Sequence, residues 1–244
     1  MSPPEPMRPA LSVILPARNE ADHVEAALRS LAAQHDDPAG RGQLEAIVVD
    51  NGSTDDTAAV TERAAGSLAA GWVRVLSDPR PGRTRAKNIG ARAARAPYLL
   101  FLDADSRASP ALVTSILARA ERGEVGASIR VRADRADGAD TLDRAFFDLM
   151  EYGKRLFAIR ANMLWCRRDV FEALGGFDER LNHAEDLEFL RRAGRAGHRV
   201  GHVTEAWIVT SPRRLHTRPA HLGMLTMFGR WTLGHFGIGR RWPY

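Results

Sequence analysis

The sequence contains little cysteine, little lysine and no long hydrophobic run. Among its 244 residues Cys166 is the single cysteine, so an intrachain disulfide is impossible and nothing indicates an oxidising compartment. The proline-rich leader, residues 1–10, lacks the apolar core of a secretory signal. The apolar runs that follow are strand-sized, whereas a membrane helix needs roughly 20 apolar residues. We therefore expect a cytoplasmic protein that does not span a membrane.

Arginine supplies almost all of the positive charge, because Lys87 and Lys154 are the only lysines. The chain has 35 Lys+Arg and 30 Asp+Glu, a formal net charge of +5. This excess would suit nucleic acid, a phosphorylated ligand or an anionic membrane surface. The cations are interleaved with acids, and no helix–turn–helix, RNA-recognition or zinc pattern is present. We expect no nucleic-acid partner, and a basic nucleic-acid-binding module is the weakest alternative.

Strand-then-helix units fill the first half of the chain. Apolar runs at residues 12–15, 44–49, 72–76 and 98–102 each precede a segment with helical spacing. This alternation predicts an α/β fold with a mostly parallel sheet flanked by helices. The second half is less regular. There we expect a strand at 125–132, a loop at 133–140, a helix near 141–159 and another from about Asp186, and the absence of a clean linker predicts a single domain.

Polar clusters follow three of the predicted strands, at Arg18–Glu20, Asp50–Asp55 and Asp103–Asp105. In parallel α/β sheets, ligands bind beyond the carboxyl ends of the strands, so these clusters predict a binding site. The two carboxylates of Asp103 and Asp105 suit Mg²⁺ or Mn²⁺ that also holds phosphate oxygens. The alternative is that they cap the following helix.

Two further features have both a binding and a structural interpretation. Asp50 ends an apolar strand, where its carboxylate can accept a hydrogen bond from a base or a ribose, whereas Ser53 and Asp56 are typical helix caps. Gly82–Gly90 places Arg83, Arg85 and Lys87 at the start of a helix. Cations are unfavourable there unless an anion is close by, so the pattern indicates either a diphosphate or solvated surface charge.

Taken in order, these motifs resemble the family 2 glycosyltransferases of the GT-A fold. Pro16–Glu20 is similar to the P-x-x-N-E of that family, Asp50–Asp55 to D-D-G-S-x-D, and Gly82–Gly90 to G-x-x-x-A-R-N-x-G. Asp103-Ala-Asp105 is similar to the D-x-D metal motif, and Gly175–Glu179 followed by Glu185-Asp186 to G-G-F-D-E and the E-D pair. The chain departs from the pattern at Asn51, where Asp is usual, and at Lys87, where Arg is usual.

The resemblance implies a GT-A-like glycosyltransferase that moves a sugar from a UDP- or GDP-sugar to an acceptor hydroxyl with inversion. It divides the chain into a disordered leader at 1–10, the domain at 11–215 and a C-terminal aromatic and basic segment at 216–244. Residues 11–106 would form the nucleotide-binding half and residues 107–215 the acceptor-facing half. The implied donor-binding residues are Pro16, Ala17, Arg18, Glu20, Asp50, Arg83, Lys87, Asp103 and Ala104.

The same resemblance implies a divalent cation, Mg²⁺ or Mn²⁺, held by Asp103, Asp105 and His216. Arg213 and Arg214 are alternatives to His216 at this end of the chain, because guanidinium binds phosphate bidentately. Asp186, assisted by Glu185, would be the catalytic base. A carboxylate within reach of a sugar hydroxyl accelerates its attack by about 10²–10⁴-fold. The competing interpretation is that both acids only favour a helix N-terminus.

The C-terminal segment and the absence of a readable acceptor motif leave alternatives open. Residues 216–244 have two interpretations. They make peripheral contact with the inner face of a membrane, near a lipid-linked acceptor, or they pack against the sheet or a second copy of the chain. Met227 stands where the processive Q-x-x-R-W motif has Gln, which argues against processivity. The other functional interpretations are a nucleotidyltransferase and a non-catalytic nucleotide-sugar-binding subunit.

Overall fold

The computed structural model describes residues 8–35, 44–68, 71–156, 159–161, 163–181 and 184–216, with Thr226 and Gly229. The strands are β1 (Leu11–Ala17), β2 (Leu44–Asp50), β3 (Val73–Ser77), β4 (Tyr98–Phe101), β5 (Ser106–Ala108), β6 (Gly126–Ala133), β7 (Leu164–Arg167) and β8 (Val200–Thr210). The helices are α1 (Val24–His35), α2 (Thr57–Ser67), α3 (Arg83–Ala93), α4 (Leu112–Glu121), α5 (Thr141–Leu156), α6 (Arg168–Ala173), α7 (Glu185–Arg195) and α8 (Arg213–His216).

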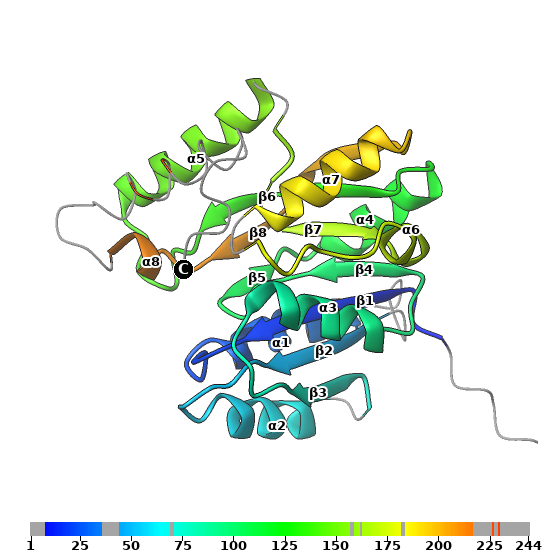
Figure 1. The fold of residues 1–244 in the computed structure, drawn as a ribbon. Helices are drawn as coiled ribbons and strands as arrows, with labels where there is room; N and C mark the ends of the chain where they lie inside the picture. Colours follow the sequence, from blue (N-terminus) through cyan, green and yellow to red (C-terminus); the bar gives the residue numbers. More distant parts are fainter. Residues whose placement is uncertain are drawn as a thin grey trace, which may run out of the picture.

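One sheet of eight strands, in the order β3-β2-β1-β4-β7-β6-β8-β5, forms the centre of the described chain, and helices cover both of its faces (Figure 1). β1 pairs in parallel with β2 and β4, and β2 pairs in parallel with β3. β1, β2 and β4 are buried and mostly apolar, as parallel strands between two helical layers must be, whereas β3 at the edge of the sheet is only half-buried. The predicted α/β fold with flanking helices is confirmed.

The far half of the sheet is mixed. β7 pairs antiparallel with both β4 and β6, and β5 pairs antiparallel with β8, while β6 and β8 are parallel. The sequence patterns predicted no strand at β5, β7 or β8. β5 and β7 have three and four residues, too few for a period of two to stand out, and the burial along β8 is irregular.

The two faces of the sheet bury separate apolar clusters. Along β1, Val13 and Leu15 belong to one cluster and Ile14 to the other, because successive side chains of a strand point to opposite faces. On the face of Ile14, α3 approaches β1 at Gly90. A Cβ atom at Gly90 would collide with the Ile14 side chain, so the last glycine of the 82–90 motif permits this close packing.

One local expectation is wrong. Asp56 makes no side-chain cap on α2, and Asp55 Oδ1 accepts from Thr57 N at 3.0 Å instead, while Ser53 Oγ accepts from Asn19 N. The helix predicted near 141–159 is confirmed as α5, with its last described residue at Leu156.

The two ends of the chain mostly lie outside the described residues. Residues 1–7 and, apart from Thr226 and Gly229, residues 217–244 are not described, so the predicted leader and C-terminal segment stay predictions. Among the helices that are described, none is both long and apolar enough to cross a membrane.

Candidate active site

The loops that follow β1 and β2 interlock at the carboxyl edge of the sheet. Asn19 Oδ1 accepts from Thr54 N at 2.8 Å, and Ser53 Oγ accepts from Asn19 N at 3.1 Å. Glu20 N donates to Thr57 Oγ1 at 2.7 Å. Each loop therefore satisfies the backbone groups of the other, and the two polar clusters predicted from sequence form one surface.

The predicted donor-binding residues of β1 and β2 lie at this edge. The sheet register sets Pro16 opposite Val49 and Ala17 opposite Asp50. Arg18 is exposed on the loop that follows, and Asp50 is half-buried, with Oδ1 3.3 Å from Ser53 N. The arrangement leaves the Arg18 guanidinium and the Asp50 carboxylate at the surface where a nucleotide could reach them.

Asn51, which departs from the family pattern, is buried and spans the gap to the loop before α3. Its Nδ2 donates to the carbonyl of Arg80 at 2.7 Å, and its Oδ1 accepts from Gly82 N at 2.6 Å. An ionised aspartate could accept the second bond but could not donate the first. The substitution therefore has a structural role that depends on the amide.

The aspartates of the D-x-D motif follow β4 and both face arginine. Asp103 accepts from Arg83 Nη2 through both carboxylate oxygens, at 2.8 and 2.7 Å. Asp105 has a side chain only 3% exposed, and its Oδ2 lies 3.3 Å from Arg213 Nη2. The methyl group of Ala104, between them, packs in the apolar core, so a contact of Ala104 with a donor would have to come from its backbone.

Arg213 joins the last described helix to the first loop. Its Nη2 donates to both carboxylate oxygens of Glu20, and its Nη1 lies 3.3 Å from His23 Nδ1. The guanidinium of this α8 residue thus sits between Glu20 and Asp105. The sequence suggested Arg213 only as a phosphate ligand, because a pairing across 193 positions has no local signal.

A cavity of about 140 Å³ opens beside Asp105. Asp22, His23, Asp134 and Asp137 are among the residues that line it. Within the described part of the chain, no three His, Cys, Asp or Glu side chains gather as a ready metal site. Asp103 and Asp105 nevertheless suit a hard cation that takes its remaining ligands from phosphate and water, as Mg²⁺ usually does.

His216, predicted as a third metal ligand, has Asp143 as a neighbour. Its Nε2 lies 2.9 Å from Asp143 Oδ1, and that carboxylate is fully buried at the start of α5. The contact joins α8 to α5 rather than to the D-x-D loop. The role of His216 in metal binding stays a prediction.

Helix α3 connects the donor edge to the second half of the chain. Lys87 Nζ donates to Glu185 Oε1 at 2.6 Å, and both side chains are only 4% exposed. Asn88 holds the backbone of Phe177 at both its N–H and its carbonyl, at 3.0 and 2.9 Å. Helix α3 therefore contacts two parts of the predicted site. Arg83 in its first turn contacts the D-x-D motif, and Lys87 in the next turn contacts the predicted catalytic pair.

The cations at the start of α3 are balanced by protein carboxylates. Arg83 faces Asp103, Arg85 donates to Asp78 Oδ2 at 2.5 Å, and Lys87 faces Glu185. In this structure the carboxylates offset the conflict between these cations and the helix dipole. Lys87 is buried, so its position beside a donor diphosphate stays a prediction.

Glu185 and Asp186 are both buried at the N-terminus of α7, and their environments shift their pKa values in opposite directions. Burial alone would raise the pKa of Glu185, but the ammonium of Lys87 outweighs it and holds that pKa below its ordinary value. Burial and the negative charge of Glu185 raise the pKa of Asp186. Two adjacent carboxylates with opposite shifts are typical of a site that separates an ion-pairing role from a proton-accepting role.

Behind this pair lies a buried polar network that the sequence did not reveal. Lys154 is fully buried on α5 and donates to Glu151 Oε1. Glu151 Oε2 lies 3.1 Å from His202 Nε2, and His202 Nδ1 lies 2.8 Å from Ser128 Oγ. Asp186 contributes an electrostatic attraction that favours the charged form of Lys154, so the network adjoins the candidate base.

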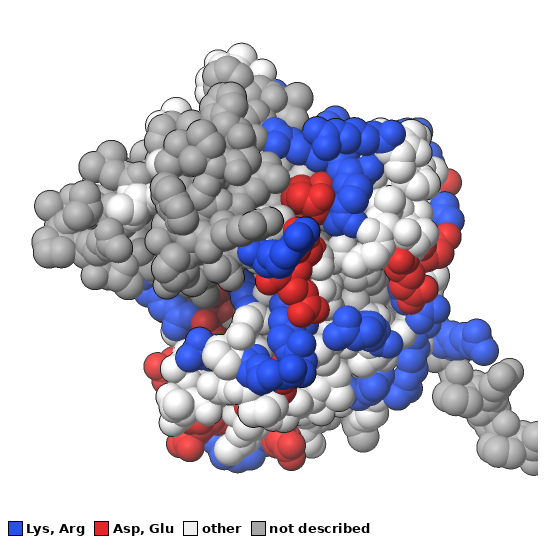
Figure 2. All heavy atoms as spheres, in the orientation of Figure 1, with Lys and Arg blue, Asp and Glu red and all other residues white. Residues whose placement is uncertain are grey.

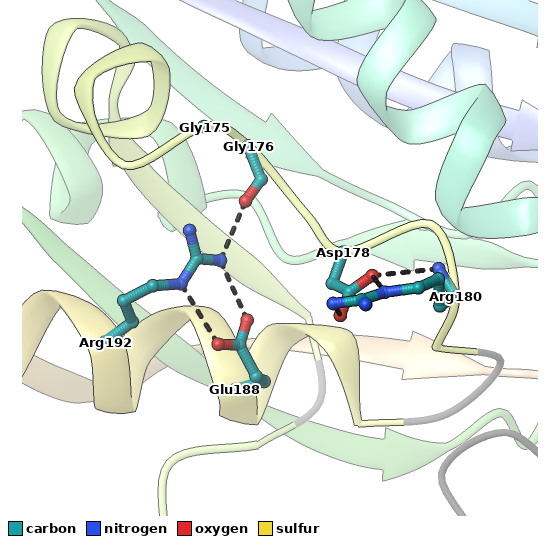
Figure 3. A pocket seen from close by; sticks show the side chains of 6 residues that line it. All are labelled: Gly175, Gly176, Asp178, Arg180, Glu188 and Arg192. Atoms are coloured by element: carbon teal, nitrogen blue, oxygen red, sulfur yellow. Dashed lines mark hydrogen bonds and ion pairs between the residues drawn. The ribbon is translucent and has the colours of Figure 1, made fainter.

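The glycine-rich turn before α7 lines a second, shallow cavity of about 250 Å³ (Figure 3). In it Arg192 points toward Glu188 and the carbonyl of Gly176, at 2.8 Å each from Nη2, while Arg180 points toward Asp178. Each arginine has a carboxylate partner within the cavity. Acidic and basic side chains both occur on the face drawn in Figure 2, with a run of Lys and Arg along its upper edge.

The comparisons with known proteins place the chain in a family. The model of glycosyl transferase family 2 matches residues 12–175, so the chain belongs to that family and is a glycosyltransferase. The uncharacterized glycosyltransferase Rv0539 of Mycobacterium tuberculosis is 31% identical over 196 residues, which cover 78% of this chain and 82% of that protein. Succinoglycan biosynthesis protein ExoA of Rhizobium meliloti is 28% identical, over 82% of this chain and 63% of ExoA.

Solved structures share the fold. The mannosyltransferase PcManGT of Pyrobaculum calidifontis, in complex with GDP-Man and Mn²⁺, superposes with a TM-score of 0.70 at 21% identity, over 96% of this chain and 65% of that one. Glucosyl-3-phosphoglycerate synthase of Mycobacterium tuberculosis, in complex with Mn²⁺, UDP and phosphoglyceric acid, gives 0.63 at 23% identity, over 95% and 79%. These likenesses confirm the GT-A-like fold expected from the sequence.

Proposed function

We propose that this glycosyltransferase moves a sugar from a UDP- or GDP-sugar to an acceptor hydroxyl with inversion, using Asp186 as the base. The observation that carries the proposal is the pair of opposite pKa shifts at Glu185 and Asp186, joined through Lys87 to the helix that also contacts Asp103. Helix α3 thereby connects the proposed donor-binding edge of the sheet to Asp186, the carboxylate proposed to accept the proton.

The donor would lie along the carboxyl ends of β1, β2 and β4. Asp50 is suited to a base or ribose, because its carboxylate is half-buried and next to the end of β1. Arg18 is exposed beside it and can reach an anion. Structures of the same fold were solved with GDP-Man, UDP-GlcNAc and UDP, which favours a nucleoside diphosphate sugar over other phosphorylated ligands.

Asp103 and Asp105 would hold a divalent cation, Mn²⁺ or Mg²⁺, together with the donor diphosphate. When bound, such a cation stabilises negative charge on the departing diphosphate. Arg83 and Arg213 already neutralise the two carboxylates, so both arginines can supply positive charge next to that diphosphate. Two structures of this fold contain Mn²⁺.

Asp186 would remove the proton of the acceptor hydroxyl as that oxygen attacks the anomeric carbon. The raised pKa of Asp186 makes its carboxylate a stronger base. Glu185 is committed to Lys87 and serves as a positioning residue for α7. Attack by the acceptor on the face opposite the leaving diphosphate gives an inverted product.

The alternatives from the sequence have less support. Family membership favours sugar transfer over nucleotidyl transfer. The non-catalytic interpretation depended on Asn51 and Lys87, and both departures have structural roles: Asn51 holds the loop at Arg80 and Gly82, and Lys87 holds Glu185. Each is therefore compatible with a working site.

The first experiment separates donor binding from turnover. Thermal stability is measured with UDP-, GDP- and dTDP-sugars, with and without Mn²⁺, for the wild type, Asp105→Asn and Asp186→Asn. A ligand at 100 times its Kd adds about 2.7 kcal/mol to the free energy of unfolding. We expect one nucleotide to stabilise the wild type and Asp186→Asn in a metal-dependent way, and the effect to be lost in Asp105→Asn.

Transfer is then followed by release of UDP or GDP. We expect Asp186→Asn to lower kcat by about 10²–10⁴-fold while donor binding is kept. The control is Glu188→Gln, which removes a carboxylate of the same helix that pairs with Arg192 on the outer side. Unchanged turnover in Asp186→Asn would contradict the base, and retained anomeric configuration in the product, measured by NMR, would contradict inversion.

A further inference from the structure

The large hydrophobic side chains exposed on the described part of the molecule all belong to one helix. Leu142, Leu149, Tyr152 and Leu156 of α5 are 49%, 63%, 64% and 64% exposed. Scattered exposed leucines are ordinary, but a contiguous apolar surface marks an interaction site. Figure 1 shows α5 at the margin of the molecule, away from the centre of the sheet.

These side chains form a regular stripe. With Ala145, which is also exposed, the positions 142, 145, 149, 152 and 156 alternate in steps of three and four. That spacing places the residues in one line along a helix and is the a/d repeat by which helices pair. We name the five residues the α5 stripe.

The face of α5 that is turned toward the protein carries several charged side chains. The buried residues of the helix are Asp143, Met150, Glu151 and Lys154, three of them charged. Phe147 also packs against the core, so the inward face of α5 mixes charged and apolar side chains, while large hydrophobic side chains are exposed on its outward face. An apolar outer face of this length is unfavourable in water unless another surface covers it.

We propose that the α5 stripe pairs with the α5 stripe of a second copy of this chain, with the two helices antiparallel about a two-fold axis. In a symmetric dimer each helix contributes the same residues, so the stripe must be complementary to itself. Antiparallel pairing about the midpoint of residues 150 and 151 sets Leu149 opposite Tyr152 of the other copy and Ala145 opposite Leu156. Leu142 lies at the end of the seam, because residue 159 of the other copy falls outside α5.

Side-chain size fits this pairing. Leu149 lies opposite Tyr152 of the second copy, and Ala145 opposite Leu156, so each layer of the seam combines a larger with a smaller side chain. Beside the seam, Phe146 lies close to Gly153 of the second copy. A Cβ atom at Gly153 would meet nothing within 4 Å, so open space is available there for an aromatic ring.

Charge fits as well. On the other side of the seam, Asp148 and Arg155 occupy equivalent flanking positions. In the antiparallel pair they are offset by two residues from the register of the seam, so Asp148 of each copy can reach Arg155 of the other. Asp148 is 68% exposed, with a long contact of 3.9 Å to Arg130, so it remains accessible to a partner. Parallel pairing would instead set Asp148 near Gly153 of the second copy, which carries no charge, and this favours the antiparallel arrangement.

The expected dimer is weak. A helix of 16 residues is about 24 Å long, and its single stripe covers less than the roughly 800 Å² per partner of a stable interface. Association should therefore depend visibly on protein concentration. The first test is sedimentation velocity over a concentration series, with Leu149→Glu as the variant, since a buried glutamate in the seam has no partner.

We expect reversible dimerisation of the wild type and at least a tenfold higher dimer Kd for Leu149→Glu, with an unchanged Tm at low concentration. Leu149 is exposed in the single chain, so folding does not depend on it. A wild type that stays monomeric at every concentration would overturn the proposal. So would a monomer in which the thiol introduced by Leu149→Cys is protected from thiol reagents, because residues of the same chain would then cover the stripe.

Charge reversal distinguishes a second copy from a lipid surface. We expect Asp148→Arg and Arg155→Asp each to weaken the dimer, by about three- to tenfold, and the double variant Asp148→Arg/Arg155→Asp to restore it to within about threefold of the wild type. An anionic membrane gives the opposite result for Asp148→Arg. If phosphatidylserine vesicles bind Asp148→Arg more tightly and no variant alters self-association, the proposal is wrong.

Disulfide cross-linking tests the orientation. Cys166 is buried, so introduced thiols react without interference from it. A mixture of Leu149→Cys and Tyr152→Cys chains should give a covalent heterodimer under mild oxidation, while Leu149→Cys alone should give little. Efficient self-cross-linking of Leu149→Cys would show a parallel seam and contradict the two-fold antiparallel arrangement.

Discussion

Helices α1 and α5 are both amphipathic, but they turn opposite faces to the protein. α1 buries Val24, Leu28 and Leu31 completely, with Ala27 between them, and exposes charged residues. α5 buries Asp143, Glu151 and Lys154 beside Met150, and it exposes all three of its leucines. A periodic stripe in the sequence therefore shows that a helix has two faces, but not which face the domain covers.

The two halves of the chain differ in where they place their charged groups. The strands and helices around β1 form a mainly apolar scaffold whose polar groups are concentrated in the loops at one edge. The second half places charged groups inside the fold, where α5, α7 and β8 meet. Such groups persist only when they are paired, and pairing holds several of them next to Asp186.

The largest expected effect on stability comes from breaking the buried pair of α5. In Lys154→Met the carboxylate of Glu151 loses its cation, and stranding a buried charge costs about 3–5 kcal/mol. The measurement is urea unfolding at neutral pH. The double variant Lys154→Met/Glu151→Gln should recover part of the loss, because the remaining partners of residue 151, His202 and the backbone N–H of Val131, can hydrogen-bond to a neutral amide.

A loss below about 1 kcal/mol in Lys154→Met would contradict this account of α5. It would mean that the other contacts of Glu151, with His202 and the backbone N–H of Val131, hold its carboxylate without Lys154. The difference between α1 and α5 would then consist only of where each helix places its apolar residues.

The same substitution on the two helices gives the next prediction. Leu28→Ala on α1 leaves a cavity under the sheet and should lower the free energy of unfolding by about 2–5 kcal/mol. Leu149→Ala on α5 should change it by no more than about 0.5 kcal/mol in dilute solution, because the side chain is 63% exposed. Equal losses in the two variants would mean that the α5 stripe is covered within a single chain.

The part of the fold that sequence predicts is the part held by local apolar patterns. The strands at β1, β2, β3 and β4 stand out because each is a short apolar run that ends at a turn. β5 and β7 become strands through pairing with β8 and with β4 and β6, a long-range property that a three- or four-residue run cannot show. The mixed half of the sheet could not be predicted for this reason.

The candidate site divides in the same way. Asp50, Asp103, Asp105 and Asp186 could be named because each follows or begins an element with a clear pattern. Their partners could not: Arg83 with Asp103 spans 20 positions, Lys87 with Glu185 spans 98, and Arg213 with Glu20 spans 193. Lys154 has a partner three positions away, yet burial of that pair depends on which face α5 turns inward.

The pH dependence of stability should separate the buried pair from an exposed one. Burial alone would raise the pKa of Glu151, but its contacts with His202 and Lys154 lower it from 4.5 to about 2. A carboxyl whose pKa is depressed by folding stabilises the protein above the unfolded value and loses that contribution as pH falls toward the folded value. The window here is pH 4.5 to about 2, and the contribution lost is about 3 kcal/mol.

The measurement compares the wild type with Glu151→Gln by denaturant unfolding across that window, where the difference between them should shrink as pH falls. Glu205 is the control, since a hydrogen bond from Arg119 also lowers its pKa to about 2. Its side chain is 42% exposed, so high salt should reduce the effect of Glu205→Gln but not that of Glu151→Gln. Equal salt sensitivity of the two would show that water reaches the α5 network.

The smallest predicted effect lies in the donor half, at Asn51. Asn51→Asp restores the residue usual in the family, yet it sets a carboxylate oxygen against the carbonyl of Arg80 where the amide now donates. Losing one buried hydrogen bond and leaving its acceptor unsatisfied costs about 1–3 kcal/mol. Asn51→Ala is the matched control, since it removes both bonds without adding charge.

The two variants should differ in their pH dependence. Once the carboxyl group introduced by Asn51→Asp is protonated, it can donate to the Arg80 carbonyl again, so folding favours the neutral acid and raises its pKa. The penalty of Asn51→Asp should therefore be full at neutral pH and decline as pH falls through that raised value, while the penalty of Asn51→Ala stays constant. A penalty of Asn51→Asp that does not change with pH would mean that the loop has rearranged around the new carboxylate, and the amide would then no longer explain why this chain departs from the family pattern.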